Sequence, residues 1–299
     1  MLPHRYFVPR ALSRTCTRGF RPVYTLRMRL ALLLPLVAGP LGCAKPPDEA
    51  SATVDELSAT LLRDFEGEAP EATASSLTSW LLANVDKQDG FSLADITTED
   101  VADMPYDGGD DGDPDLTQQR GIGVTHRVVG TFDQHVAIVP EADQSFADSD
   151  PSGGYYKAWD RTLAEGDADG FRAGSDLRTD NHIEKENLGV EIPYDLGKDY
   201  RWITVDLDGT PTDTLMFRSY ELAPGWSEDG ANGLVYGWTI ELWVPDPAGD
   251  LVWYNASWCQ LVTSVDGMID DDFVVKEIIS GTIDYMDGTA SHATGADAE

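Results

Sequence analysis

Positive charge is scarce in this sequence. The 299 residues include 21 lysines and arginines against 53 aspartates and glutamates, a formal net charge of −32 at pH 7. A protein that binds nucleic acid needs a basic face to neutralise phosphates, so the composition argues against that partner. The eight tryptophans, eleven tyrosines and nine phenylalanines are too many for a disordered chain. We therefore expect a folded, acidic protein with one sizeable core.

Cysteine and long apolar runs are scarce as well. The three cysteines are Cys16, Cys43 and Cys259, and a chain that is cleaved before Cys43 and lipidated on it would keep one thiol and no internal disulfide. We interpret Cys259 as a buried, inert thiol, because no histidine is near it in sequence to activate it. The apolar run Leu30–Ala38 is shorter than the roughly 20 residues that cross a bilayer. A transmembrane anchor is therefore not expected.

The first 43 residues have the features of an export signal. They hold seven arginines and no acidic residue, and the apolar run Leu30–Ala38 is followed by Gly39–Cys43. A basic segment, a short apolar core and small residues before a cleavage point describe a secretory signal peptide. Residues 44–299 then carry all 53 acidic residues and the remaining 14 bases, a net charge of −39. Such a surplus keeps an exported protein soluble or adapts it to salty surroundings.

The end of this segment, Leu41-Gly42-Cys43, resembles a bacterial lipobox. The resemblance implies that Cys43 becomes the lipidated first residue of the mature protein. Pro40 stands where the lipobox usually has leucine, so ordinary cleavage nearby is the alternative. Met28 would begin a signal of more usual length. The predicted location is the cell envelope, with the membrane as a partner through the N-terminal lipid.

Residues 44–106 predict a short tether followed by helices. A Thr-x-x-Glu capping box at Thr53 and apolar residues at helical spacing predict a helix over 53–66. Pro70 begins a second helix, whose apolar face contains Leu77, Trp80, Leu81 and Val85. A third short helix is expected over 98–104. Residues 107–121 begin with five acidic residues among glycines and a proline, which predicts a linker, with calcium binding as the functional alternative.

Residues 122–286 predict a mixed domain of strands and helices. Alternating or continuous apolar residues predict strands over 124–129, 135–139, 181–188, 201–207, 215–222, 235–244 and 251–263. The Pro- and Gly-containing residues 245–250 predict a hairpin turn. A helix is expected over 152–164, and another over 271–286 with Val275, Ile279, Ile283 and Met286 on one side. The tail over 287–299 is expected to be disordered.

This order of elements is similar to the helix-grip (START-like) fold over about 122–286. That fold implies a curved antiparallel sheet that wraps a C-terminal helix and leaves an apolar cavity between them. We therefore predict an α+β, helix-grip-like protein: an antiparallel sheet packed against a C-terminal helix, preceded by a small N-terminal helical segment. Four stretches also resemble a group of uncharacterised bacterial lipoproteins, which implies an envelope location and no known activity: Asp143–Asp148, Tyr155–Thr162, Leu177–Asn181 and Tyr200–Asp206.

One candidate metal site lies on the predicted strand over 181–188. If the strand is extended, Asp180, His182, Glu184 and Glu186 share one face. Three carboxylates and an imidazole are ligands that suit a divalent cation. The alternative is a polar outer face of a half-buried strand, with Ile183 directed inward.

A second candidate site imitates a calcium-binding EF-hand loop between Glu165 and Asp176. Asp167, Asp169 and Asp176 match ligand positions, and the loop follows a predicted helix. Glu165 replaces the first aspartate, Asp176 replaces the bidentate glutamate, and Arg172 stands where an aliphatic residue packs. These departures make Ca²⁺ the weaker interpretation, so no resident cofactor is expected.

The sequence favours a binding role over catalysis. It contains no nucleophile elbow, His-Glu-x-x-His helix, Walker loop or dinucleotide-binding glycine motif. We predict a lipid-anchored envelope protein that acts as a non-catalytic binding or interaction module. A small apolar ligand would lie between Trp238, Trp258 and the last helix, and an envelope protein is another possible partner. The alternatives are a divalent-metal-dependent hydrolase that uses the Asp180–Glu186 row, and a purely structural envelope component with a filled core.

Overall fold

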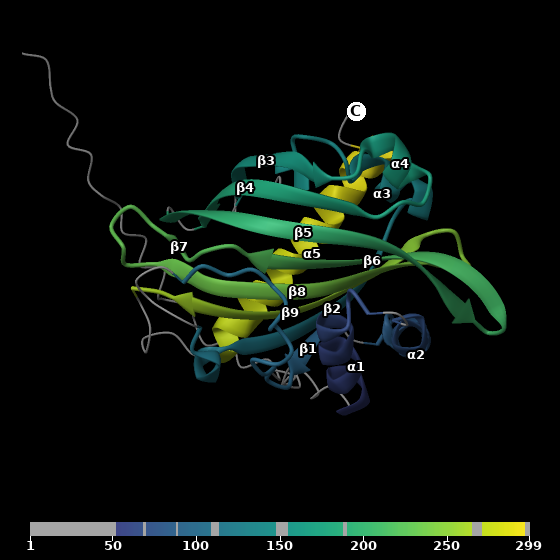
Figure 1. The fold of residues 1–299 in the computed structure, drawn as a ribbon, viewed down its shortest axis with the longest axis horizontal. Helices are drawn as coiled ribbons and strands as arrows, with labels where there is room; N and C mark the ends of the chain where they lie inside the picture. The colour runs from purple at the N-terminus through teal and green to yellow at the C-terminus, as the bar shows by residue number, and fades with distance from the viewer. Residues whose placement is uncertain are drawn as a thin grey trace, which may run out of the picture. The chain divides into compact units, whose positions relative to one another are not determined.

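A single antiparallel β-sheet organises the protein. The computed structural model describes residues 52–67, 70–87, 89–108, 114–147, 155–187, 190–264 and 271–296. In these ranges the sheet has nine strands in the order β1–β2–β9–β8–β6–β5–β4–β3, and the short β7 pairs with β8 (Figure 1). The strands are β1 (Gly90–Leu93), β2 (Arg120–Val128), β3 (Tyr155–Glu165), β4 (Leu177–Asn187), β5 (Val190–Leu207), β6 (Thr210–Glu221), β7 (Gly225–Trp226), β8 (Gly233–Pro245) and β9 (Leu251–Val262).

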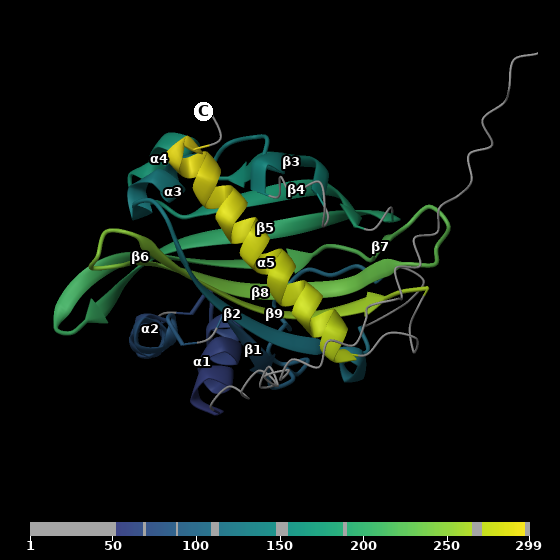
Figure 2. The same cartoon turned by 180° about the vertical axis from the view of Figure 1, so that it is seen from behind.

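Helices cover both faces of this sheet. The described helices are α1 (Ala52–Arg63), α2 (Glu71–Asn84), α3 (Phe132–Ile138), α4 (Ala168–Arg172) and α5 (Asp271–Thr294), with short 3₁₀ turns η2 (Leu116–Gln118) and η3 (Ser145–Ala147). Helix α5 crosses one face diagonally, as Figure 2 shows. Trp238, Ile240 and Leu242 of β8 belong to the core that contains α1 and α2, whereas Trp243 belongs to the core that contains α5. Successive strand residues point to opposite faces, so α5 and the α1–α2 pair lie on opposite sides of the sheet.

The N-terminal helices form the core of the second face. Leu61 of α1 and Leu77 and Leu81 of α2 are fully buried in it, as expected for apolar residues at helical spacing. The hydroxyl groups of Ser58 and Tyr254 lie 2.7 Å apart and link α1 to β9. Burial of each leucine contributes about 1.5–3 kcal/mol relative to an exposed side chain. The predicted helices over 53–66 and after Pro70 are thereby confirmed.

Most of the predicted strands are also confirmed. Those expected over 181–188, 201–207, 215–222, 235–244 and 251–263 correspond to β4, β5, β6, β8 and β9. The turn over 245–250 joins β8 to β9, with the Asp246 amide donating to the Asp250 carbonyl at 2.9 Å. The predicted combination of an antiparallel sheet, a C-terminal helix and small N-terminal helices is therefore correct, although strands dominate the fold.

The helix predicted over 152–164 is wrong, because residues Tyr155–Glu165 form edge strand β3 paired with β4. Both Trp159 and Arg161 are buried on the α5 side of the sheet. The Arg161 guanidinium donates to the Val139 carbonyl, and its Nε donates to Asn181 Oδ1 at 2.8 Å. The inward-directed Arg161 interrupts the alternation of apolar and polar residues along β3. The apolar residues that remain are spaced as they would be in a helix, which explains the wrong prediction.

Two further assignments near α3 and α1–α2 are wrong. The strand predicted over 135–139 is helix α3, which begins with a capping box between Thr131 and Gln134. This reciprocal cap satisfies amide groups that a strand would pair with a neighbour. The helix predicted over 98–104 is instead a series of turns, with Asp100 accepting from the amide and the hydroxyl of Thr97. Aspartate side chains often compete with the backbone for hydrogen bonds in this way.

Helix α5 is longer than predicted. It continues to Thr294, and Thr289 and Ala290 are buried beyond the expected end at Met286. A Cβ atom on Gly288 would lie 2.6 Å from the Ala147 carbonyl oxygen, so glycine permits close packing of the helix on η3. The predicted tail is therefore helical over 287–294, while residues 297–299 lie outside the described residues.

The segment predicted as a linker, 107–121, follows β1 and ends in β2 of the same sheet. Strand β1 precedes it and pairs with β2, which begins at Arg120. The Tyr106 hydroxyl donates to the Val235 carbonyl at 2.8 Å. The described residues all belong to one compact unit that spans Lys45–Glu299. Residues 109–113 of the acidic segment lie outside the described residues.

Candidate functional site beneath the C-terminal helix

Strand register arranges residues in two neighbouring rows on the α5 side of the sheet, which we name the hydroxyl row and the carboxyl row after their polar groups. The hydroxyl row crosses four strands, because Lys198 pairs with Ser219, Ser219 with Thr239, and Thr239 with Ser257. The carboxyl row lies beside it and consists of Leu196, Glu221, Gly237 and Cys259. Directly paired residues on neighbouring strands have Cβ atoms about 4.5–5.5 Å apart. Both rows therefore form one continuous region of the sheet.

Small side chains occupy the centre of this region. We call Ser219, Gly237, Thr239, Ser257 and Cys259 the small-residue face. All of these except Ser219 are partly exposed, although they lie on central strands. Helix α5 makes its closest approaches to β2, η3 and α3 rather than to β6, β8 and β9. The small-residue face is thus on the α5 side of the sheet but is not among the closest contacts of the helix backbone.

Large aromatic side chains fill the neighbouring part of the same face. Trp253 and Trp243 are in edge-to-face contact, with ring centroids 4.9 Å apart. Tyr285 of α5 packs on Trp253 at 5.2 Å, and Phe217 packs on Trp243 at the same distance. These contacts fix α5 on the sheet at one end, so the contrast between large and small side chains localises the candidate site to the small-residue face.

The Glu221 carboxyl group is the most unusual feature of the candidate site. Glu221 is 1% exposed, and among the described residues its Oε2 atom has no hydrogen-bond partner. The carboxyl lies over Gly237, where a Cβ atom would be 3.4 Å from Oε1. Burial raises the pKa of Glu221 well above its ordinary value of 4.5. An unpaired buried polar group costs about 1–3 kcal/mol, so this position needs an explanation.

Two hydroxyl groups beside Glu221 share this lack of partners. The Oγ atom of Ser219 and the Oγ1 atom of Thr239 are buried and make no hydrogen bond to any described residue. Ser219 is two residues before Glu221 on β6, and therefore on the same face. Three unsatisfied oxygen atoms consequently belong to one small region of the sheet.

A second buried carboxylate on the same face is fully compensated. Glu241 lies 3.5 Å from the Lys198 ammonium group, and it accepts a 2.7 Å hydrogen bond from Trp253 Nε1. The Lys198 ammonium group lies 4.9 Å from the centroid of the Phe217 ring. Buried ion pairs are retained when such contacts offset desolvation. The comparison shows that Glu221, and not Glu241, has capacity for an additional partner.

Cys259 has the properties of an unreactive thiol. It is the free cysteine of the described residues. Burial raises its pKa to about 12, with a further contribution from Glu221. A thiol with such a pKa is protonated at neutral pH and is a poor nucleophile. Cys259 is partly exposed and not fully buried as expected, while its raised pKa agrees with the interpretation of an inert side chain.

The predicted position of Trp238 and Trp258 beneath the last helix is wrong. Both are buried in the core that contains α1 and α2, on the opposite face from α5. Trp258 Nε1 donates to the Ala94 carbonyl at 2.9 Å. Trp238 packs on Tyr236, with ring centroids 4.6 Å apart. The two tryptophans cannot line a space between the sheet and α5.

The candidate metal row on β4 has the predicted alternation, but His182 and Glu186 pair with residues outside the row. Ile183 is buried, whereas Asp180 and His182 are exposed. His182 Nδ1 lies 2.8 Å from Asp195 Oδ1, and this hydrogen bond is the main cause of its raised pKa. Glu186 pairs with Lys157 at 2.9 Å. In the part of the chain that the structure describes, no three His, Cys, Asp or Glu side chains form a cluster suited to a metal ion.

The EF-hand-like carboxylates also have structural partners. Asp167 caps α4 by accepting from the amides of Asp169 and Gly170 at 3.1 and 2.8 Å. Asp176 accepts from the Trp202 amide at 3.1 Å. The segment before this loop is strand β3, so the helix that an EF-hand requires is not present there. These observations favour a turn between β3 and β4 over a calcium loop.

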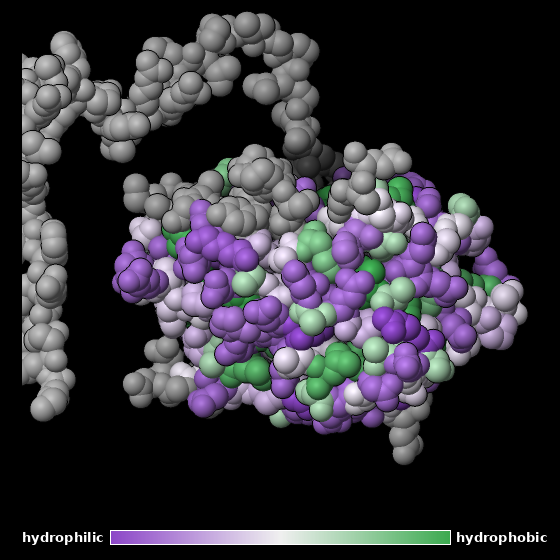
Figure 3. All heavy atoms as spheres, turned by 90° about the horizontal axis from the view of Figure 1, so that it is seen from above, coloured by the Kyte–Doolittle hydropathy of each residue, from purple (hydrophilic) through white to green (hydrophobic). Residues whose placement is uncertain are grey.

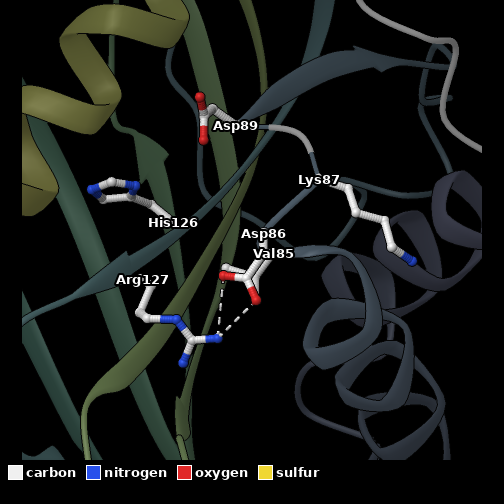
Figure 4. Close-up of a pocket in the computed structure, with 6 residues that line it drawn as sticks. All are labelled: Val85, Asp86, Lys87, Asp89, His126 and Arg127. Carbon is white, nitrogen blue, oxygen red and sulfur yellow. Dashed lines mark hydrogen bonds and ion pairs between the residues drawn. The ribbon is translucent and has the colours of Figure 1, made fainter.

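A separate surface pocket of about 350 Å³ lies between the end of α2 and β2 (Figure 4). Its lining residues are Val85, Asp86, Lys87, Asp89, His126 and Arg127. Arg127 pairs with Asp86 at 3.4 Å and also with Asp246. His126 pairs with Asp287 of α5 at 2.9 Å. Several of its charged groups are thus engaged in internal ion pairs, which makes this pocket a weaker candidate than the small-residue face.

The protein surface gives little indication of a docking site. Figure 3 shows mainly hydrophilic side chains with small, separate hydrophobic patches on the face that it presents. The large apolar side chains that are exposed among the described residues are Val129, Leu163 and Phe273.

In the part of the chain that the structure describes, no helix combines the length and the apolar character needed to cross a bilayer. The predicted signal peptide and Cys43 lie outside the described residues.

Comparisons with known proteins give matches only among solved structures. No protein-family model and no curated protein matches the sequence. A protein of Thermus thermophilus is 10% identical, with a TM-score of 0.38, over 58% of this chain and 97% of its own. A putative uncharacterized protein from Rhizobium leguminosarum is 12% identical, with a TM-score of 0.31, over 56% of this chain and 92% of its own.

Proposed function

We propose that the protein is an exported, lipid-anchored envelope protein that binds a small molecule between its sheet and α5 without catalysis. The observation that carries this proposal is the small-residue face. Four of its five residues are partly exposed although they lie on central strands, so this part of the α5 side is less filled than the region around Trp253. Three buried oxygen atoms beside them have no hydrogen-bond partner among the described residues, which marks this as a region whose polar groups the fold alone leaves unsatisfied.

The order of elements supports a helix-grip-like arrangement. Strand β2 is followed by a helix, by further antiparallel strands and by a long final helix. The last strand, β9, lies between β2 and β8. Helix α5 then crosses the face that these strands share (Figure 2). The proposed ligand would bind on the α5 side, because the side of α1 and α2 holds a filled core.

Native mass spectrometry of protein gently extracted from its own cells tests the binding role. We expect a population with a bound small molecule, lost on denaturation. A clean apo mass under conditions that preserve the fold would favour a purely structural component. Stoichiometric metal by elemental analysis would instead favour a metal-dependent hydrolase.

Detergent phase partitioning tests the lipid anchor separately. Cells that process bacterial lipoproteins should yield a mature chain that begins at Cys43 and enters the detergent phase. The Cys43→Ala variant should remain in the aqueous phase. Recovery of an uncut leader, or of unmodified Cys43 in the wild-type protein, would contradict the anchor.

A further inference from the structure

Helix α3 carries a histidine at a position that faces the apolar core. His135 is fully buried, and its ring lies edge-to-face against Trp243 of β8, with ring centroids 5.7 Å apart. Val136 beside it belongs to the core that contains α5. A Cβ atom on Gly130 would lie 3.1 Å from the His135 ring and 2.6 Å from the Thr294 side chain. The ring is therefore enclosed between α3, the sheet and the turn that leads into α3.

Among the described residues, one ring nitrogen of His135 has a partner and the other has none. Nδ1 lies 2.9 Å from the Thr131 carbonyl oxygen. A carbonyl group only accepts hydrogen bonds, so Nδ1 carries the proton of the neutral ring and Nε2 holds a lone pair. Nε2 is buried without a hydrogen-bond partner. The surroundings that the structure describes thus suit the neutral imidazole and offer no acceptor to a second N–H group.

We propose that His135 makes the packing of α3 sensitive to acid. Protonation of its imidazole leaves a buried positive charge without a counter-ion, and α3 then separates from α5 and the sheet. Histidine suits this role because its charge changes between about pH 5 and 8. Burial lowers the pKa of His135, and the hydrogen bond to the Thr131 carbonyl offsets part of this effect. The inference is independent of the proposed ligand.

The sign of the pKa change determines the direction of the response. Well above the ordinary histidine pKa of 6.5, the imidazole is neutral whether α3 is packed or released, so pH does not affect release. As pH falls below this value, the exposed imidazole of the released state binds a proton and the buried one does not. Release therefore becomes more favourable, by up to about tenfold per pH unit. The gain ends when pH reaches the lowered pKa of the packed state.

The other histidines near α3 have partners for their charged forms. His292 of α5 lies 2.9 Å from Glu141, and His126 of β2 lies 2.9 Å from Asp287 of α5. Protonation of either imidazole therefore forms an ion pair and not an isolated charge. Further charged groups on α3 and on the elements next to it are exposed or have partners: Asp133 is exposed, Glu241 pairs with Lys198, and Arg161 and Arg172 donate to the Val139 and Ala137 carbonyl groups.

Hydrogen–deuterium exchange of the full-length protein at about pH 7.5 and about pH 5.5 tests the inference. The measured quantity is the protection factor, corrected for the intrinsic pH dependence of exchange, of peptides from α3 and from β9 as a reference. We expect the protection of α3 to fall at least about threefold at the lower pH, while the protection of β9 stays constant. His135→Phe keeps an aromatic ring that cannot be charged and should abolish the fall.

Three variants serve as controls. His135→Gln is a second neutral replacement, and it serves if His135→Phe does not fold. His182→Gln removes an exposed imidazole that pairs with Asp195, and His292→Gln removes the paired imidazole of α5. Both of these proteins should keep the fall in α3 protection, because His135 is intact in them.

Several results would overturn the inference. They are equal protection of α3 at both pH values, a fall that persists in the His135 variants, a fall that β9 shares, and loss of the fall in His182→Gln or His292→Gln. The small molecule sought by native mass spectrometry decides the proposed function separately from these results.

Discussion

Two buried glutamates on one face of the sheet differ in their partners, and this difference has consequences for stability. Glu241 is paired with Lys198 and Trp253, whereas Glu221 has an unpaired oxygen. Because burial raises the pKa of Glu221, folding favours its neutral form, and Glu221→Gln, which is neutral at every pH, should increase the free energy of unfolding at neutral pH by about 1–3 kcal/mol. Urea unfolding of both proteins provides the measurement, with Glu228→Gln as the exposed control.

The pH dependence of this effect follows from the sign of the pKa change. The folded-state pKa of Glu221 is raised above its ordinary value of 4.5. The contribution of the protonated Glu221 carboxyl group to the free energy of unfolding is fully present below the unfolded-state pKa. It is lost as pH rises through the folded-state pKa. The advantage of Glu221→Gln should therefore be small at about pH 4 and larger at about pH 8. An advantage that is constant across this range would show that the carboxyl group does not change its charge there.

For the Lys198–Glu241 pair, removal of one partner should lower the free energy of unfolding, in contrast to the increase expected for Glu221→Gln. Lys198→Met should lower the free energy of unfolding by about 3–5 kcal/mol, because it leaves Glu241 buried without a cation. The double variant Lys198→Met/Glu241→Leu should recover most of this loss. Lys87→Met, at an exposed position, provides the control. Equal losses in the single and double variants would mean that packing, rather than the uncompensated charge, determines the effect.

The sequence predicted some site residues and missed others for a definite physical reason. Alternation in 235–244 correctly groups Trp238 with Ile240 and Leu242, but it does not say which face a helix will cover. That choice depends on the N-terminal helices, which occupy the Trp238 face. Glu221 was missed because a glutamate near the end of a strand is usually exposed. The continuous burial of β6 from Leu215 to Glu221 could be anticipated only from the apolar character of its neighbours.

At the scale of secondary structure, two glycines of α5 predict opposite effects of the same substitution. Gly288→Ala should destabilise the protein by about 1–3 kcal/mol, because its Cβ atom would lie 2.6 Å from the Ala147 carbonyl oxygen. Gly281→Ala should stabilise it by up to about 1 kcal/mol, because nothing lies within 4 Å of the added atom. Thermal unfolding of both variants provides the measurement. A stabilised Gly288→Ala protein would contradict the close packing of α5 on η3.

The same helix shows how far periodicity can predict an element. Its apolar residues Val275, Ile279, Ile283 and Met286 do pack against the sheet core, as their spacing indicates. The extension to Thr294 depends on contacts with η3 and α3, which are distant in sequence. Strand β3 was misassigned for a related reason, since the partners of Arg161 come from Val139 and Asn181. The local residue pattern predicts an element correctly only where the apolar residues of that element itself hold it in place.

At the scale of the whole molecule, the acidic surplus predicts that salt stabilises the fold. Residues 44–299 carry a net charge of −39, and mutual repulsion disfavours the compact state. Raising sodium chloride from about 0.01 to 1 M shortens the screening length from roughly 30 to 3 Å. We expect the melting temperature to rise by at least about 3 °C, which corresponds to roughly 1 kcal/mol for a domain of this size.

A non-ionic solute separates screening from general solvent effects. Sucrose at matched osmolality is excluded from the protein surface but screens no charge, so it should give a smaller increase in melting temperature than sodium chloride. Because the acidic residues are spread over the described surface rather than gathered at one site, charge removal at a single position such as Glu228 should leave the salt response nearly unchanged. An unchanged melting temperature across the salt series would contradict the repulsion argument. The acidic composition would then contribute to solubility after export and not to folding.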